Sequence, residues 1–200
     1  MGENFQDQPN IQFSVSSNTT FNGTTGYVTY GSTSDFFGSL PTPNLDSWAL
    51  QVSNAINNSI SASTFQALFA VQFDLLVKGV PDVEVAIDTT VQYGAGPSGI
   101  ISSASIGLMP FSRGNLHIGS SDPLEYPVLN PNYFLVDFDL DIQIAIAKWT
   151  RKFWLAQPIG DMVTEIYPGF DTVPANATDQ QWREWIKSAC AYIPILLGYG

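Results

Sequence analysis

Charged residues are scarce in this sequence. Only 12% of its 200 residues are Asp, Glu, Lys or Arg, which is about half the usual share for a globular domain. The 18 acidic residues outnumber the 7 basic ones and give a formal net charge of -11 at pH 7. Such a surface repels nucleic-acid phosphates and anionic lipid headgroups, so we expect neither nucleic acid nor a membrane as a partner.

Cysteine, histidine and long apolar runs are also nearly absent. The single cysteine, Cys190, excludes an internal disulfide, and no apolar run is long enough to span a bilayer. The single histidine, His117, has no orienting carboxylate or nucleophile near it in the sequence. We therefore interpret His117 as a partly exposed strand residue and assign no catalytic residue.

Hydrophobic periodicity in the 44% hydrophobic chain predicts one α+β domain with a substantial core. Apolar spacing predicts helices at about 45–57, after Ser63, at 137–153, and after a capping box at 178–181. Alternation predicts strands within 11–30 and at 83–87, 100–109 and 115–118. We expect an antiparallel sheet with helices packed on one face.

Two clusters admit both a functional and a structural interpretation. Asp137, Asp139 and Asp141 could bind a cation such as calcium, but the helix dipole and helix-start capping already account for them, so we predict no metal site. Trp182 and Trp185 could be sugar platforms, but their helical spacing favours packing in the core.

The richest motif is the run Pro110-Phe111-Ser112-Arg113-Gly114-Asn115-Leu116-His117-Ile118-Gly119-Ser120-Ser121-Asp122-Pro123. It reads as a turn, a short strand and a second turn that Asp122 caps. The order of its residues resembles the start of the C-terminal region of the glucose-methanol-choline (GMC) oxidoreductases, with Arg113, Gly114, Asp122 and Pro123 as motif residues.

Three further stretches follow the family's order. Gly2 to Asn10 is similar to the exit from the flavin domain, Asp137 to Asp141 to a helix start, and Trp182 to Lys187 to the helix before the catalytic segment. The resemblance is nearest to the fungal glucose oxidase, glucose dehydrogenase and aryl-alcohol oxidase branch. It implies an exit segment at 1–10, a substrate-binding domain at 11–187 with its C-terminal-type region from about 108, and an aberrant tail at 188–200.

The resemblance also implies what each part does. The intact relatives use FAD to oxidise CH-OH groups of alcohols or sugars, and this part forms the pocket wall beside an FAD-binding domain. Ile106 stands where glucose oxidases carry a pocket tryptophan, and Met109 lies close to it in sequence. Loss of that indole favours an apolar or aromatic alcohol over glucose.

Two family requirements are missing. The run Gly94-Ala95-Gly96-Pro97-Ser98-Gly99 comes nearest to a flavin fingerprint, but a proline interrupts its turn and no helical pattern follows, so we interpret it as a loop. No histidine follows the tryptophan-rich helix. We therefore expect a fragment without the FAD-binding domain that binds no cofactor and is inactive alone. The alternatives are a non-catalytic secreted carbohydrate-binding domain and an inert product of a truncated gene model.

Four N-glycosylation sequons, at Asn18, Asn22, Asn57 and Asn176, favour a secreted parent glycoprotein. The residues after Met1 do not form a secretory signal, so we expect that signal to lie on a missing N-terminal half.

Overall fold

The computed structural model describes residues 2–17, 26–88 and 99–190. These residues form two compact units. Helix α4 (Asp137–Trp154) begins among the residues of the first unit and ends among those of the second. None of the described helices is both long and apolar enough to cross a bilayer.

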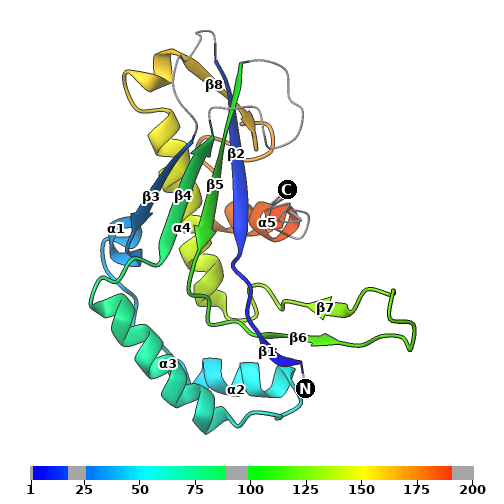
Figure 1. Ribbon diagram of the computed structural model, residues 1–200. Coiled ribbons are helices and arrows are strands. Elements are labelled where there is room, and N and C mark those ends of the chain that lie inside the picture. The colour runs from blue at the N-terminus through cyan, green and yellow to red at the C-terminus, as the bar shows by residue number, and fades with distance from the viewer. Residues whose placement is uncertain (1, 18–25, 89–98, 191–200) are drawn as a thin grey trace. The chain divides into compact units, whose positions relative to one another are not determined.

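The first unit contains residues 1–9, 31–82 and 107–142. Its elements are β1 (Glu3–Phe5), α1 (Thr33–Phe37), α2 (Leu45–Ala55), α3 (Ala62–Val77), β6 (Gly114–His117) and β7 (Val128–Asn130) (Figure 1). The strands form a sheet of order β1-β6-β7, and both of its pairs are antiparallel. The expected helix at 45–57 is confirmed, whereas the next one begins at Ala62, because Ser61 rather than Ser63 caps it by accepting a hydrogen bond from Thr64 N (3.2 Å).

Aromatic rings fill the core of the first unit. The Trp48 ring lies 5.0 Å from the rings of both Phe111 and Phe138, and Phe69 meets Phe111 edge-on at 5.3 Å. Rings at these separations contribute beyond the area that they bury. They join α2, α3, the start of α4 and the segment before β6 into one core.

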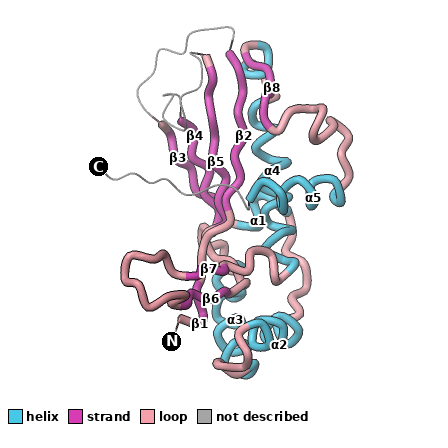
Figure 2. Tube along the Cα trace, turned by 90° about the vertical axis from the view of Figure 1, so that its right-hand side faces the viewer, coloured by secondary structure: helices cyan, strands magenta, loops and turns pink. Residues whose placement is uncertain are grey.

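The second unit contains residues 10–30, 83–106 and 143–200. Its elements are β2 (Asn10–Ser17), β3 (Tyr27–Gly31), β4 (Val83–Asp88), β5 (Ile100–Gly107), the 3-10 turn η1 (Ile159–Asp161), β8 (Val163–Tyr167) and α5 (Asp179–Cys190). The strands form a five-stranded sheet of order β3-β4-β5-β2-β8. In Figure 2 the part of α4 in this unit and α5 cover the same face of that sheet. The predicted α+β class, with helices on one face of an antiparallel sheet, is confirmed.

The covered face of this sheet carries the buried residues of β2. Phe13 is fully buried, and its ring lies 5.5 Å from Trp185 and 6.3 Å from Trp182. Both tryptophans are almost completely buried, so the predicted packing role is confirmed. The capping box before α5 is also confirmed, since Gln181 N donates to Thr178 Oγ1 and Thr178 N to Gln181 Oε1.

A buried ion pair ties α4 to β8 inside the second unit. Arg151 Nε and Nη2 donate to the two carboxylate oxygens of Glu165 at 2.8 and 2.6 Å, and the guanidinium lies 4.6 Å from the Trp182 ring centre. Both side chains are nearly inaccessible to solvent. Removing one partner leaves the other charge buried without compensation.

We therefore expect Arg151→Met to lower the free energy of unfolding by about 3–5 kcal/mol, because Glu165 would remain buried without its cation. Urea denaturation measures this loss. The double variant Arg151→Met/Glu165→Leu is the control and should recover much of the stability. A double variant as unstable as the single one would show that the pairing is not the cause.

Candidate functional site

The candidate site is a hollow of about 350 Å³ in the first unit, beside the segment that leads into β6. Leu68, Val71 and Leu75 of α3 form an apolar side, and Met109 lies half-buried in the wall. The remaining lining residues are Asn4, Gln6, Gln72, Leu108 and Arg113. An apolar surface with a few convergent polar groups is typical of a small-molecule site.

The amide of Gln72 fixes the backbone of the hollow's wall. Gln72 is 9% exposed, and its Nε2 donates to the carbonyl oxygens of Met109 at 2.6 Å and Pro110 at 3.2 Å. Its Oε1 accepts a hydrogen bond from Arg113 Nη2 at 3.2 Å. One helical side chain therefore holds both ends of the segment 109–113.

Sequence reasoning missed Gln72, although its position contained a signal. Phe69, Gln72 and Leu76 recur at offsets of three and seven, so they lie on one buried stripe of α3. An amide in such a stripe needs polar partners, since burying it unpaired is costly. The sequence could have marked Gln72 as a buried hydrogen-bonding residue, but not which backbone it holds.

Arg113, predicted as a motif residue, is buried and bonded within its own segment. Only 3% of it is exposed. Its Nη1 donates to the carbonyl oxygens of Pro110 and Ser112, and its guanidinium lies 5.6 Å from the Phe69 ring centre. Burial lowers the pKa of Arg113 to about 10, and the nearby carboxylate of Asp139 partly offsets this effect. The side chain is charged near neutral pH, and its cation is used to fold the segment.

Asp139 binds this segment from the other side. One carboxylate oxygen accepts a hydrogen bond from Phe111 N at 2.8 Å and the other from Ser112 N at 2.7 Å. In return, Val136 N donates to Ser112 Oγ at 2.9 Å. Asp139 lies in the first turn of α4, where its charge suits the helix dipole. The expected capping of its own helix start was wrong, because its oxygens satisfy the backbone of another segment.

Burial raises the pKa of Asp139 to about 6, against the opposing effect of its hydrogen bonds with Ser112 and Phe111 and of the Arg113 charge. No group of three or more His, Cys, Asp or Glu suited to a metal occurs within residues 2–17, 26–88 and 99–190. The two oxygens of Asp139 hold the backbone of Phe111 and Ser112, so Asp139 acts as a structural carboxylate.

The other predicted motif residues shape the chain beyond Arg113. A Cβ on Gly114 would lie 1.9 Å from the carbonyl oxygen of Asn130, so only glycine allows β6 and the exit of β7 to approach this closely. Asp122 Oδ1 accepts a hydrogen bond from Leu124 N at 2.9 Å, as the predicted turn requires. Asp122 and Pro123 are exposed. These residues build a turn and do not line the hollow.

The two predicted wall residues lie in different units. Met109 lines the hollow, whereas Ile106 lies on β5, half-buried and paired in register with Asn10 of β2. Ile106 does not line the hollow. Its role as a pocket residue stays a prediction.

The only histidine has a partner that sequence reasoning did not find. His117 Nε2 lies 3.0 Å from Glu3 Oε1, because β1 pairs with β6. The two residues are far apart in the chain, so only the sheet register brings them together. The side chain of His117 is 46% exposed, in agreement with the predicted exposed strand position.

The remaining predicted positions are the four glycosylation sites and the glycine-rich run at 94–99. Asn57 and Asn176 are exposed, as a glycosylation site requires, and Asn18 and Asn22 lie outside the described residues. Residues 94–98 of the glycine-rich run also lie outside them, but Ile100, just beyond Gly99, begins strand β5 rather than a helix. A flavin fingerprint needs a helix N-terminus at that point. No residue is therefore assigned to FAD.

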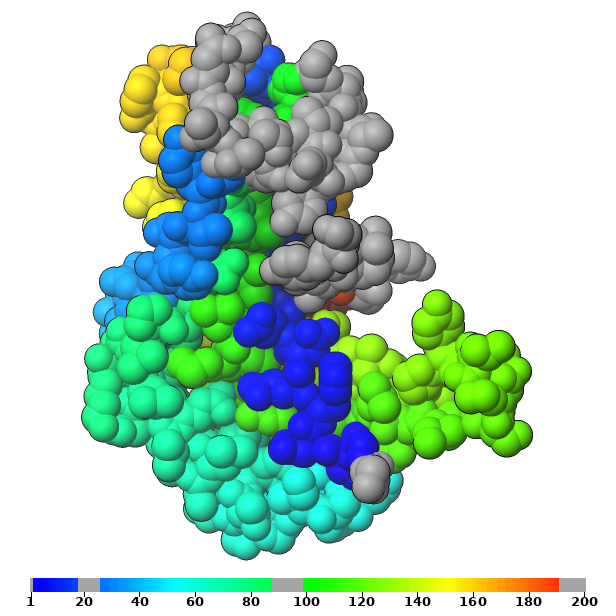
Figure 3. All heavy atoms as spheres, viewed as in Figure 1, coloured from blue at the N-terminus to red at the C-terminus, as the bar shows by residue number. Residues whose placement is uncertain are grey.

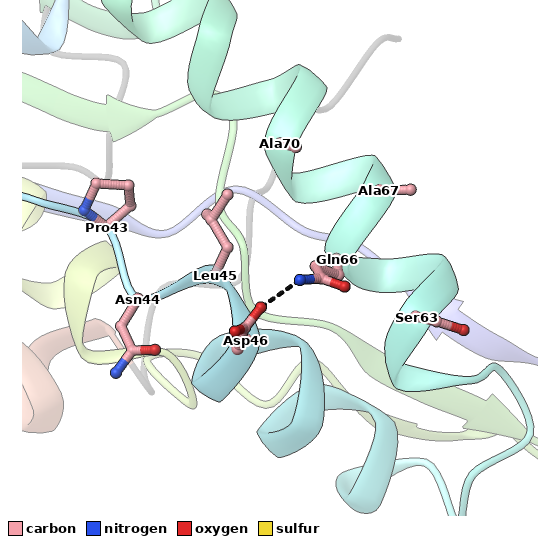
Figure 4. A pocket seen from close by; sticks show the side chains of 8 residues that line it. All are labelled: Pro43, Asn44, Leu45, Asp46, Ser63, Gln66, Ala67 and Ala70. Carbon is pink, nitrogen blue, oxygen red and sulfur yellow. Dashed lines mark hydrogen bonds between the residues drawn. The ribbon is translucent and has the colours of Figure 1, made fainter.

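A second hollow, of about 480 Å³, lies between the start of α2 and α3 (Figure 4). Gln66 Nε2 donates to Asp46 Oδ1 across it, and the facing residues of α3 are Ser63, Ala67 and Ala70. These residues are exposed and small or polar. Nothing in this lining selects a ligand.

The sequence is similar to known oxidoreductases. Residues 110–194 match the GMC oxidoreductase family model. The glucose oxidase-like protein fsoC of Humicola fuscoatra is 32% identical over 192 residues, which are 92% of this chain and 31% of that protein. Glucose oxidase of Penicillium chrysogenum is 38% identical over 84 residues, 40% of this chain and 13% of that protein.

Solved structures show the same fold. A fungal aryl-alcohol oxidase superposes with a TM-score of 0.64 at 16% identity and covers 92% of this chain and 36% of its own. An FAD-dependent oxidoreductase from Chaetomium thermophilum gives the same TM-score and identity, over 94% of this chain and 36% of its own. The chain thus spans about a third of the length of these relatives.

The raised pKa of Asp139 predicts a pH-dependent stability. Between about pH 4 and pH 6 the folded chain keeps a proton on Asp139 that the unfolded chain has released, so the free energy of unfolding falls as the pH rises. The difference between a pKa of about 6 and the ordinary 3.8 corresponds to about 3 kcal/mol. Asp139→Asn removes this titration. As the pH rises from 4 to 6, we expect the difference in free energy of unfolding between wild type and variant to narrow by up to about 3 kcal/mol. If the free energies of unfolding of wild type and variant instead change in parallel from pH 4 to 6, the assignment of the raised pKa to Asp139 is contradicted.

Gly114→Ala should destabilise the chain by about 3 kcal/mol, because its Cβ collides with backbone that cannot rotate away. Gly38→Ala is the matched control. Its added Cβ meets nothing within 4 Å, and only backbone strain opposes it, because φ 76° and ψ -44° lie outside the regions that L residues prefer, so we expect a loss of about 1–2 kcal/mol. Thermal unfolding compares the two variants, and equal losses would be evidence against the close approach at Gly114.

Proposed function

Since the chain carries the C-terminal domain of the GMC oxidoreductases, we propose that it supplies the substrate-pocket wall of an FAD-dependent oxidoreductase acting on CH-OH groups of alcohols. The observation that supports this proposal is the apolar hollow beside Met109. The buried amide of Gln72 fixes the backbone of Met109. The intact enzyme would also need an FAD-binding domain, whose flavin would supply the redox chemistry. This chain's own residues bind and orient the alcohol.

The lining of the hollow favours an apolar or aromatic alcohol over glucose. Leucine, valine and methionine side chains offer contact area but few hydrogen bonds, whereas a sugar presents hydroxyls on every side. A hydroxyl buried against such a wall without a partner loses its hydrogen bonds to water. Aryl-alcohol oxidase activity, the activity named for one structural neighbour, fits this lining.

The proposal keeps the domain division expected from the sequence. Residues 11–187 form the substrate-binding part and 1–10 its connection to a flavin domain, whereas the family match extends to residue 194 and so includes residues 188–194 of the segment expected to be an aberrant tail. Of that segment, residues 191–200 lie outside the described residues. The exposure of Asn57 and Asn176 supports a secreted, glycosylated parent protein. Burial of Trp182 and Trp185 counts against the alternative, a carbohydrate-binding domain, since these rings face the core.

A chimaera tests the proposed specificity. This chain replaces the 192 aligned residues of fsoC, and oxidation of benzylic alcohols is compared with that of glucose. We expect benzylic alcohols to give the higher kcat/KM. Met109→Ser should raise the KM for benzylic alcohols about tenfold with little change in kcat, because a methionine side chain in apolar contact contributes roughly 1–3 kcal/mol. A chimaera that prefers glucose would contradict the proposal.

A further inference from the structure

The first unit projects a two-stranded arm, residues 116–129, here called the β6–β7 arm. Figure 3 shows its loop standing out into solvent, away from α2 and α3 of the same unit. Its apolar side chains are unusually open: Ile118 and Leu124 are each 89% exposed and Tyr126 is 92% exposed. Val128 and Leu129, on the returning strand, are at least half exposed.

Both faces of the arm carry apolar surface. In register, Leu116 pairs with Leu129 and His117 with Val128, and successive pairs of a ladder point to opposite faces. Leu116 and Leu129 therefore share one face, while Val128 lies on the other. Strand β1 pairs with β6 only at residues 114 and 115, so the arm beyond them is a two-stranded ribbon, which buries too little by itself to be stable. Contiguous exposed apolar surface marks an interaction site.

We propose that the β6–β7 arm is a docking surface for the flavin-binding part of a GMC oxidoreductase. The inference rests on the proposed function and adds the surface through which the wall domain engages its partner. This chain superposes on 36% of the fungal aryl-alcohol oxidase, so most of that molecule has no counterpart here. The arm is an extensive apolar surface on which such a partner can dock.

The charge of the arm defines the partner further. Residues 114–136 contain Asp122 and Glu125 but no Lys or Arg. The complementary surface is an apolar patch bordered by basic side chains. A second copy of this chain fits poorly, because both copies carry a formal charge of -11 and would bring the same two carboxylates together.

Hydroxyl-radical footprinting of the fsoC chimaera tests the proposal. Tyr126 is the reporter, and Tyr30, 59% exposed on β3, is the matched control with the same ring chemistry. Relative to the isolated chain, labelling of Tyr126 in the chimaera should fall about tenfold, as for a side chain at the core of an interface, and far more than that of Tyr30. Bound flavin is measured on the same sample.

Each outcome separates this proposal from the proposed function. Protection of Tyr126 with flavin bound and alcohols oxidised supports both, and protection without oxidation supports docking alone. Unchanged labelling of Tyr126 overturns the docking proposal, whether or not the chimaera oxidises alcohols. A dimer of the isolated chain that protects Tyr126 would assign the arm to a second copy and also overturn it.

A double variant provides a second measurement. Leu124→Ser/Tyr126→Ser should leave the free energy of unfolding of the isolated chain unchanged, because both side chains are exposed there. In the chimaera the same change should cause loss of flavin and a lower Tm. Leu50→Ser/Val77→Ser, at exposed positions of α2 and α3, is the control and should lose less. Equal losses in the two chimaera variants would count against a specific role of the arm.

Discussion

The buried hydrogen bonds from Gln72 and Asp139 to the segment 109–113 are the interactions on which the first unit depends. The segment contains a run of backbone groups that must be buried while the chain turns from the wall of the hollow into β6. Backbone N–H and C=O groups cannot be buried unpaired without a large cost. A carboxylate satisfies the N–H groups and an amide satisfies the carbonyls. Because these partners come from α4 and α3, the packing of both helices fixes the position of Met109.

Arg113 extends the same network at an electrostatic cost. Its cation and the carboxylate of Asp139 are both removed from water. Burial lowers the pKa of Arg113 and raises the pKa of Asp139, so it favours the neutral form of each group. The attraction between these two buried charges adds little net stability, because desolvation offsets most of it.

Much of the fold follows from local pattern, and the site follows only in part. Helices α2 and α5 and strand β5 could be predicted because their apolar spacing matches the period of the element and turn residues mark the ends. The Glu3–His117 pair and the bonds of Asp139 could not, since they depend on strand register and helix packing. Asp139 looked like one of three capping residues because its neighbours in sequence are also acidic, and only burial distinguishes it.

The proposed substrate wall and the proposed docking arm lie at the two ends of one short stretch of chain. Met109 and Arg113 line the hollow, and residues 116–129 form the exposed arm. Between them lies Gly114, where an added Cβ would lie 1.9 Å from the carbonyl oxygen of Asn130. Because the chain packs so closely at Gly114, the base of the arm is held in a fixed position beside the network. The network, rather than any single wall residue, is therefore the basis of the proposed site.

Amide hydrogen exchange of Phe111 and Ser112 in the isolated chain tests this claim most directly. These two amides donate to Asp139, and the account predicts that they exchange only on global unfolding, as slowly as the central amides of α3 and α4. Exchange at the rate of an open loop, with α3 and α4 still protected, would contradict it.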